Sequence, residues 1–288
     1  NIASNNQAVQ GSQAARLSGR DRMFFEDAVR GGTMEVAMAR LAWALGRALA
    51  AYGFFVATVL EQPSVGYQFA QLALALNDRV AKGSMGSKVL LPLGSLGHFC
   101  VPIKECLAYY AKGRQEGLAC GDFSNLSLIC SMQSHYSIFT SEDLNEALRE
   151  VDSSLVVMQR TKDAMNTMSL RQARQLLRAL VGRTSKPTSL SDEDFDEAAE
   201  WKNLRAANFG YPLLVFSWLK HTLLYLFGEY DEACKLGLEA LAWFPAAPGL
   251  PLQPHFTFML CLSLLARYGK ATADEQKEYD KHIEQLHQ

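Results

Sequence analysis

The stretch YLFGEYDEACKLGLEALAWF, residues 225–244, decides the fold. The apolar run from Tyr211 to Phe227 is too regular for a loop, and Gly228 follows where a helix would end, because glycine adopts the left-handed capping conformation without a side-chain penalty. Beyond it, residues on one face of a second helix recur at three- and four-residue intervals: Tyr230, Ala233, Cys234, Gly237, Ala240, Leu241 and Phe244. The stretch therefore predicts an antiparallel helix pair, whose small residues let another helix approach closely.

Similar pairs recur along the chain at intervals of about forty residues, a period typical of helical repeats. Second helices are predicted near Gly66, Ile103, Glu142, Tyr230 and within 191–208. First helices are predicted over 46–61, 87–100, 124–139, 166–182, 208–227 and 252–268. No segment alternates apolar and polar residues as a strand would. We therefore predict an all-α, right-handed solenoid of antiparallel, tetratricopeptide-like helix pairs.

The solenoid is expected to span residues 34–288, with a loop at 182–194 inside it. Residues 1–33 are expected to be poorly or only partly ordered, because they contain few large apolar residues. Acidic capping patterns at 140–143, 191–194 and 272–275 predict helix starts. Since the numbering begins at Asn1, we expect the chain to be a segment of a larger protein.

Composition limits the partners and the compartment. A net charge of −2 and a pI near 6.3 argue against nucleic acid as a partner. The six cysteines lie among apolar neighbours without a C-x-x-C pair, which favours buried thiols in a reducing, cytoplasmic compartment. The longest apolar runs are interrupted by four charged or polar residues: Arg40, Arg47, Lys220 and His221. We therefore predict no membrane span.

Three long stretches also resemble a known region. They are LSDEDFDEAAEWKNLRAANFGYPLLVFSWLKHTLLYLFGEYDEA at 190–233, FPAAPGLPLQPHFTFMLCLSLLARY at 244–268 and ADEQKEYDKHIEQL at 273–286. They are similar to the helical region between the ATPase and GAF modules of large signalling proteins, which also carry a serine/threonine-kinase-like domain and a histidine kinase. The resemblance implies a regulatory helical array. It implies no catalysis, because the kinase, ATPase and GAF motifs are absent from this sequence.

Four histidines lie on or beside predicted first helices, which line the concave surface of tetratricopeptide-like solenoids. They are His98, His135, His221 and His255, and Trp218 lies on the same helix as His221. One interpretation is a polar row that contacts a partner. The other is that each ring bonds a neighbouring helix while its aromatic neighbour packs in the core.

A second candidate contact surface is basic. Arg171, Arg174 and Arg178 fall on one face of the helix predicted at 166–182, where they could bind an acidic segment or could face solvent.

Motifs for catalysis, cofactors and metals are weak. GSMGSK at 83–88 lacks the spacing and the preceding strand of a phosphate loop. Ser95 and His98 lack the strand–turn–helix setting of a nucleophile, and His282 and His287 point apart on a helix. We therefore expect no enzyme activity, no cofactor and no metal.

The expected function is a non-catalytic scaffold that presents a concave helical surface to a protein, a peptide or an adjacent domain of the same chain. The alternative is a small-molecule sensor with a pocket enclosed by the superhelix and lined by His135, Trp218 and His221.

Overall fold

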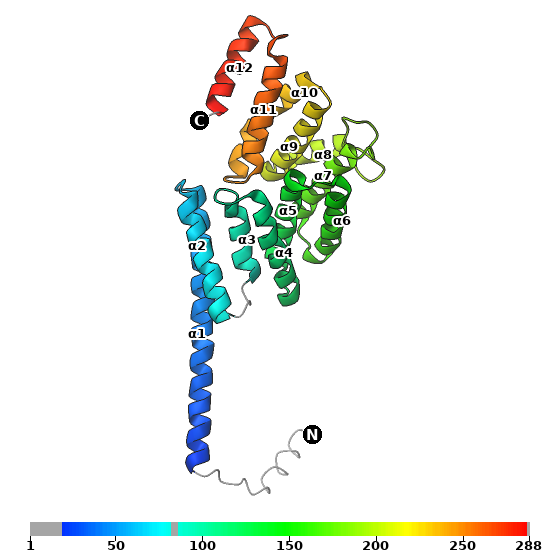
Figure 1. The fold of residues 1–288 in the computed structure, drawn as a ribbon. Helices are drawn as coiled ribbons and strands as arrows, with labels where there is room; N and C mark the ends of the chain where they lie inside the picture. The colour runs from blue at the N-terminus through cyan, green and yellow to red at the C-terminus, as the bar shows by residue number, and fades with distance from the viewer. Residues whose placement is uncertain (1–18, 82–85, 287–288) are drawn as a thin grey trace.

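A computed structural model describes residues 19–81 and 86–286. Within these ranges the chain forms α-helices and no strand, which confirms the all-α prediction (Figure 1). The helices are α1 (Gly19–Thr58), α2 (Pro63–Leu76), α3 (Gly86–Gly97), α4 (Ile103–Cys120), α5 (Phe123–Thr140), α6 (Leu144–Thr161), α7 (Ala164–Leu180), α8 (Glu197–Ala207), α9 (Gly210–Leu226), α10 (Tyr230–Ala240), α11 (Leu252–Tyr268) and α12 (Ala273–Leu286). A π-helical turn, η1 (Asn77–Ala81), follows α2, and a 3-10 helix, η2 (Leu241–Ala246), follows α10.

The helices follow one another as pairs. Each odd-numbered helix contacts the next odd-numbered one, from α1 through α11, and most even-numbered helices pack between two of them (Figure 1). Two differ: α12, the last described helix, packs on only one odd-numbered helix, α11, and α8 packs mainly on α9, with the connection over residues 181–196 between it and α7. The regular stacking is therefore interrupted at one place in the described chain.

The corner at Gly228 forms as the sequence predicts. Helix α9 ends at Leu226, and Gly228 has a left-handed φ of 81°. The Gly228 N–H donates to the Tyr225 carbonyl at 3.1 Å, and the Glu229 N–H donates to the Leu224 carbonyl at 2.9 Å. These two bonds form a Schellman motif, which satisfies carbonyl groups that the end of the helix leaves open.

The small face of α10 allows close approach, as predicted. A Cβ atom on Gly237 would lie 2.6 Å from Leu260 in α11 and 3.0 Å from His221 in α9. The helix ends earlier than expected, at Ala240, and the chain continues as the 3-10 helix η2, which contains Pro245. Proline has no N–H to continue an α-helical ladder.

Two of the three predicted helix starts are confirmed. The Thr272 N–H donates to Glu275 at 2.7 Å and the Glu275 N–H donates to Thr272 Oγ1 at 3.3 Å, which is a reciprocal capping box. Asp143 caps α6 by accepting from the Asn145 N–H. The start predicted at 191–194 is wrong. Asp196 caps α8 instead, and residues 191–194 belong to the preceding loop.

Helix α1 begins at Gly19, so residues 19–33 of the predicted N-terminal segment are helical, and residues 1–18 lie outside the described residues. The stretch Arg40–Thr58 is long and apolar enough to cross a membrane, although its two arginines led us to predict no span. A third of it, 33%, is buried within the protein. A helix that packs in a soluble bundle can pass the same test of length and composition.

Candidate functional site

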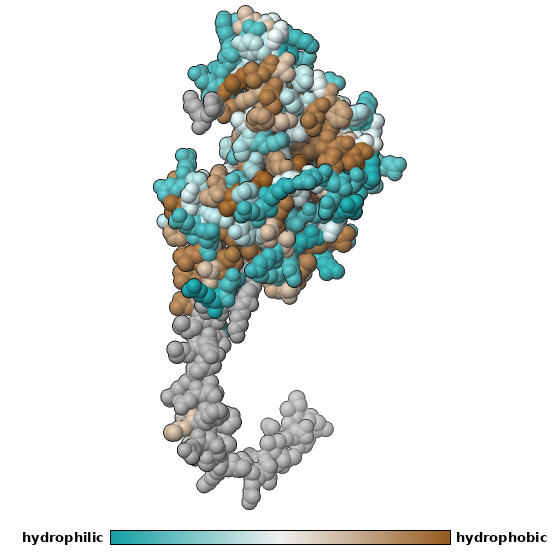
Figure 2. Space-filling model, in the orientation of Figure 1, coloured by the Kyte–Doolittle hydropathy of each residue, from teal (hydrophilic) through white to brown (hydrophobic). Residues whose placement is uncertain are grey.

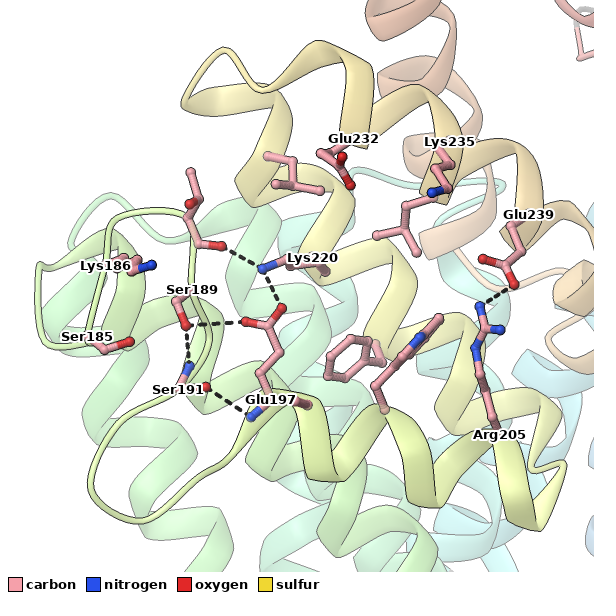
Figure 3. Close-up of a pocket in the computed structure, with 16 residues that line it drawn as sticks. Ser185, Lys186, Ser189, Ser191, Glu197, Arg205, Lys220, Glu232, Lys235 and Glu239 are labelled. Carbon is pink, nitrogen blue, oxygen red and sulfur yellow. Dashed lines mark hydrogen bonds and ion pairs between the residues drawn. The ribbon is translucent and has the colours of Figure 1, made fainter.

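A cleft of about 730 Å³ opens where the regular stacking is interrupted. Its walls come from the loop 185–191 and from helices α8, α9 and α10 (Figure 3). This volume falls within the range of about 300–1,000 Å³ that ligand sites occupy. Because a long connection joins α7 to α8, its loop forms a wall of the cleft rather than a tight turn, and the described contact between the two helices includes a hydrogen bond from Gln172 to Glu200 at 3.3 Å.

The loop wall is fixed by hydrogen bonds and an ion pair. Lys220 of α9 forms an ion pair with Glu197 at the start of α8. The Lys220 ammonium also donates to the Thr188 carbonyl at 2.6 Å, and Glu197 accepts the Leu190 N–H at 2.7 Å. Leu190 and Phe195, both in the connection over residues 181–196, are buried in a core cluster together with apolar residues of α7 and α9. The loop is therefore held in one shape before any partner binds.

Apolar side chains form the floor of the cleft. Trp201 of α8 lies against Phe216 of α9, with ring centroids 5.1 Å apart, and Leu224 and Leu236 also line the cleft. The Arg205 guanidinium covers the Trp201 ring at 4.6 Å and pairs with Glu239. A floor of half-buried Trp201 beside buried Phe216, bordered by charges, is suited to an amphipathic side chain or peptide.

Two exposed lysines at the rim have no ion-pair partner within the described residues. Lys186 lies on the loop and Lys235 lies on α10, on facing sides of the cleft (Figure 3). The other two basic residues of the lining, Lys220 and Arg205, are paired with glutamates. A carboxylate can thus approach the two lysines without breaking an existing ion pair, and the exposed Glu232 lies on the same rim near Lys235.

The three predicted arginines do not form a free basic surface. Arg178 Nε lies 2.7 Å from Asp192, and Arg171 donates to the Asp194 carbonyl at 3.3 Å. Arg174 pairs with Asp152 of α6 at 2.7 Å. The acidic segment that two of these arginines contact is the chain's own loop, so their role here is to anchor it.

Burial contradicts the predicted partner-binding row at His135, His221 and Trp218, whereas His98 and His255 are half-buried. His135, His221 and Trp218 are no more than 2% exposed, so a partner cannot contact them in this conformation. His135, Trp218 and His255 instead meet in the core between α5, α9 and α11, where Trp218 donates to His255 at 2.9 Å. The alternative interpretation, hydrogen bonds across helices, fits His98 with Tyr136 at 3.0 Å and His221 with Ser263 at 3.1 Å.

Burial holds these rings neutral. Desolvation lowers the pKa of His135 and of His221 to about 4 each. It also lowers the pKa of His98 to about 4, and it lowers the pKa of His255. All four therefore disfavour protonation, which suits a packing role rather than proton transfer near neutral pH.

Ser95 and Lys88, which belong to the weak nucleophile and phosphate-loop motifs, make contacts within the fold. The Ser95 hydroxyl hydrogen-bonds to the Tyr110 hydroxyl at 3.1 Å, and Lys88 Nζ lies 3.7 Å from Asp122. Among the described residues, no group of three or more histidines, cysteines and acids is arranged to hold a metal.

Sequence reasoning missed the residues that line the cleft, above all Trp201, Lys186 and Lys235. The available signal was the loop itself, which is longer than a turn between stacked helices requires. Comparison with protein-family models and with curated proteins found no match for this chain.

Proposed function

We propose that this chain is a non-catalytic, cytoplasmic scaffold, built as a right-handed, tetratricopeptide-like solenoid, that binds a segment of another protein or of a neighbouring domain. The succession of odd-numbered helices in contact supports the solenoid, because each pair then buries its apolar face on the next. The resemblance to the helical region of multidomain signalling proteins supports a regulatory role within a larger chain.

The observation that carries the proposal is the cleft between the loop 185–191 and α8–α10. Its apolar floor accepts a side chain of the bound segment, and its rim lysines, Lys186 and Lys235, attract an acidic residue beside it. The walls are already fixed by Lys220 and Glu197, so binding orders little of the protein. Preorganisation of this kind increases affinity for a given buried area.

A displayed library of random peptides tests the proposal. The purified chain should enrich peptides that combine an aromatic or large aliphatic residue with Asp or Glu. The double variant Lys186→Glu/Lys235→Glu should lose them, whereas Lys281→Glu, an exposed charge reversal on α12, should retain them. Absence of enrichment, or equal enrichment on all three proteins, would contradict the proposal.

The cleft also supports the second candidate, a small-molecule sensor. The proposed ligand site is, however, the cleft lining around Trp201 and not the predicted site at His135, Trp218 and His221, which are buried. A ligand at a hundred times its Kd adds about 2.7 kcal/mol to the folded state. A thermal-shift screen of small acidic aromatic compounds, repeated on Lys186→Glu/Lys235→Glu, separates this candidate from a peptide site.

A further inference from the structure

The outer face of α1 carries a stripe of apolar side chains that no described residue covers. Its members are all exposed and follow alternating spacings of four and three residues: Leu41, Leu45, Ala48, Tyr52, Phe55 and Val59. The opposite side of α1 is buried by α2 and α3: Ala50 belongs to a core cluster with Ala73 and Val89, and Ala57 to one with Ala70 and Leu93. Alternating four- and three-residue spacing is the pattern of a helix that packs along a second helix.

Helix α2 adds a second stripe beside the first, formed by Val65, Phe69, Leu72 and Leu76. The rings of Tyr52 and Phe69 lie edge to face, 4.9 Å apart, which joins the two stripes into one surface. Figure 2 shows brown side chains along the outer edge of this helix pair. We name this surface, the two stripes together with Leu60, the α1–α2 face.

The size of the α1–α2 face suits a protein interface. Eight of its large side chains are between 39% and 65% exposed: Leu41, Leu45, Tyr52, Phe55, Val59, Leu60, Val65 and Leu72. At roughly 100 Å² each they offer about 800 Å², which is the share of one partner in a standard interface. A monomer that leaves such a patch in water is prone to associate.

The face is complementary to itself. A two-fold axis level with residue 50 sets two copies of α1 antiparallel, with Leu41 opposite Val59, Leu45 opposite Phe55 and Ala48 opposite Tyr52. The smallest residue of the stripe then meets one of the largest. Such reciprocal pairing is what a two-fold interface between identical chains requires.

The same two-fold axis also pairs the apolar stripe of α2 with its copy. The Gly53 position of α1 lies against Gly66 and Ala70 of α2, so residue 50 is level with the middle of the α2 stripe. The axis pairs Val65 with Leu76 and Phe69 with Leu72 across the two copies. Charge repulsion between arginines does not disfavour this arrangement. Arg40 lies level with residue 60 of the other copy and Arg47 with residue 53, so neither arginine faces another.

We propose that the α1–α2 face binds a second copy of this chain, with α1 antiparallel to α1. The inference does not depend on the cleft, which lies on other helices.

Sedimentation equilibrium of the chain at about 50 µM tests the proposal. We expect twice the 31.9 kDa mass of one chain. Leu45→Glu and Phe55→Glu place a charge in the interface and should give a monomer, with circular dichroism melts showing that they fold. Leu265→Glu, at a site on α11 that is 57% exposed, should remain a dimer. A monomeric wild-type chain, or a dimer that survives Leu45→Glu, overturns the proposal.

Cross-linking tests the antiparallel register. In a background with Cys100→Ser and Cys120→Ser, which removes the two exposed thiols, Ala48→Cys and Tyr52→Cys are prepared as separate proteins. Mild oxidation should link the mixture of the two. Each variant alone should give little covalent dimer. Equal cross-linking of Ala48→Cys alone contradicts this register.

Discussion

The indole Nε1 of Trp218 in α9 donates a hydrogen bond to Nδ1 of His255 in α11, at 2.9 Å. The bond joins two successive odd-numbered helices through the core, and Phe139 of α5 stacks on the same indole at 5.3 Å. One side chain thereby links three stacked helices.

Replacing that side chain tests how much the link stabilises the stack. Trp218→Phe removes the donor and leaves a cavity, so we expect a loss of about 2–4 kcal/mol in the free energy of unfolding, measured with urea. Trp243→Phe is the control, because Trp243 is only half-buried in the 3-10 helix η2. Equal losses in the two variants would show that the hydrogen bond and the burial of Trp218 add no more stability than half-buried Trp243 does.

The crossing of α1 and α2 depends on a missing side chain. A Cβ atom on Gly53 would lie 2.5 Å from the Gly66 carbonyl oxygen, too close for backbone to tolerate. Gly→Ala inside a helix usually stabilises by about 0.5–1 kcal/mol. Here we expect Gly53→Ala to destabilise by about 1–3 kcal/mol in urea unfolding. Gly269→Ala should be neutral or stabilising, because nothing lies within 4 Å of that position. A stabilising Gly53→Ala would mean that the helices are not in such close contact.

Acid should destabilise the fold through its buried histidines. An unfolded histidine titrates near pH 6.5, whereas burial lowers the pKa of His135 and of His221 to about 4. The unfolded state therefore binds protons first, so stability is present above pH 6.5 and is lost as pH falls toward 4. The loss is on the order of 2 kcal/mol for each ring by pH 5.

His135→Phe separates this effect from general acid lability, because phenylalanine keeps the ring but does not titrate. The variant should lose less stability than the wild-type chain between pH 7 and pH 5, by on the order of 2 kcal/mol. Identical pH dependence of urea unfolding in the two proteins would mean that His135 is protonated as easily in the fold as in the unfolded chain.

The loop over residues 181–196 should loosen when its anchor is removed. Arg178 pairs with Asp192, whose side chain is only 4% exposed, so Arg178→Ala leaves a buried carboxylate without its cation. We expect a loss of about 3 kcal/mol and faster proteolysis within the loop. Lys104→Ala removes an exposed pair with Glu142 and should leave stability almost unchanged, because solvent screens such pairs. Equal protease resistance in both variants would show that Arg178 does not order the loop.

The sequence predicted the helices well because their signals are local. Gly228 ends α9, the Thr272 and Glu275 side chains cap α12, and the small residues of α10 contact α11, all within a few residues of the pattern that predicted them. The start of α8 was misplaced because Ser191 to Asp194 resembles a cap, whereas Arg178 and Arg171 of α7 hold that segment in a loop.

The candidate site was predicted poorly because it depends on contacts between distant segments. His135 and Trp218 lie on the helices that were expected to line a groove, but neighbouring helices cover them on all sides. Trp201 and Lys235 look unremarkable in sequence, and they line one cleft only because α8 and α10 both pack on α9.

Fluorescence anisotropy of one library-selected peptide tests the central claim most directly. We expect saturable binding to the wild-type chain and to Lys281→Glu. We expect binding at least about tenfold weaker to Lys186→Glu/Lys235→Glu, where a tenfold change in Kd corresponds to about 1.4 kcal/mol. Equal affinity for all three proteins would contradict the claim that the cleft between the loop 185–191 and α8–α10 is the binding site.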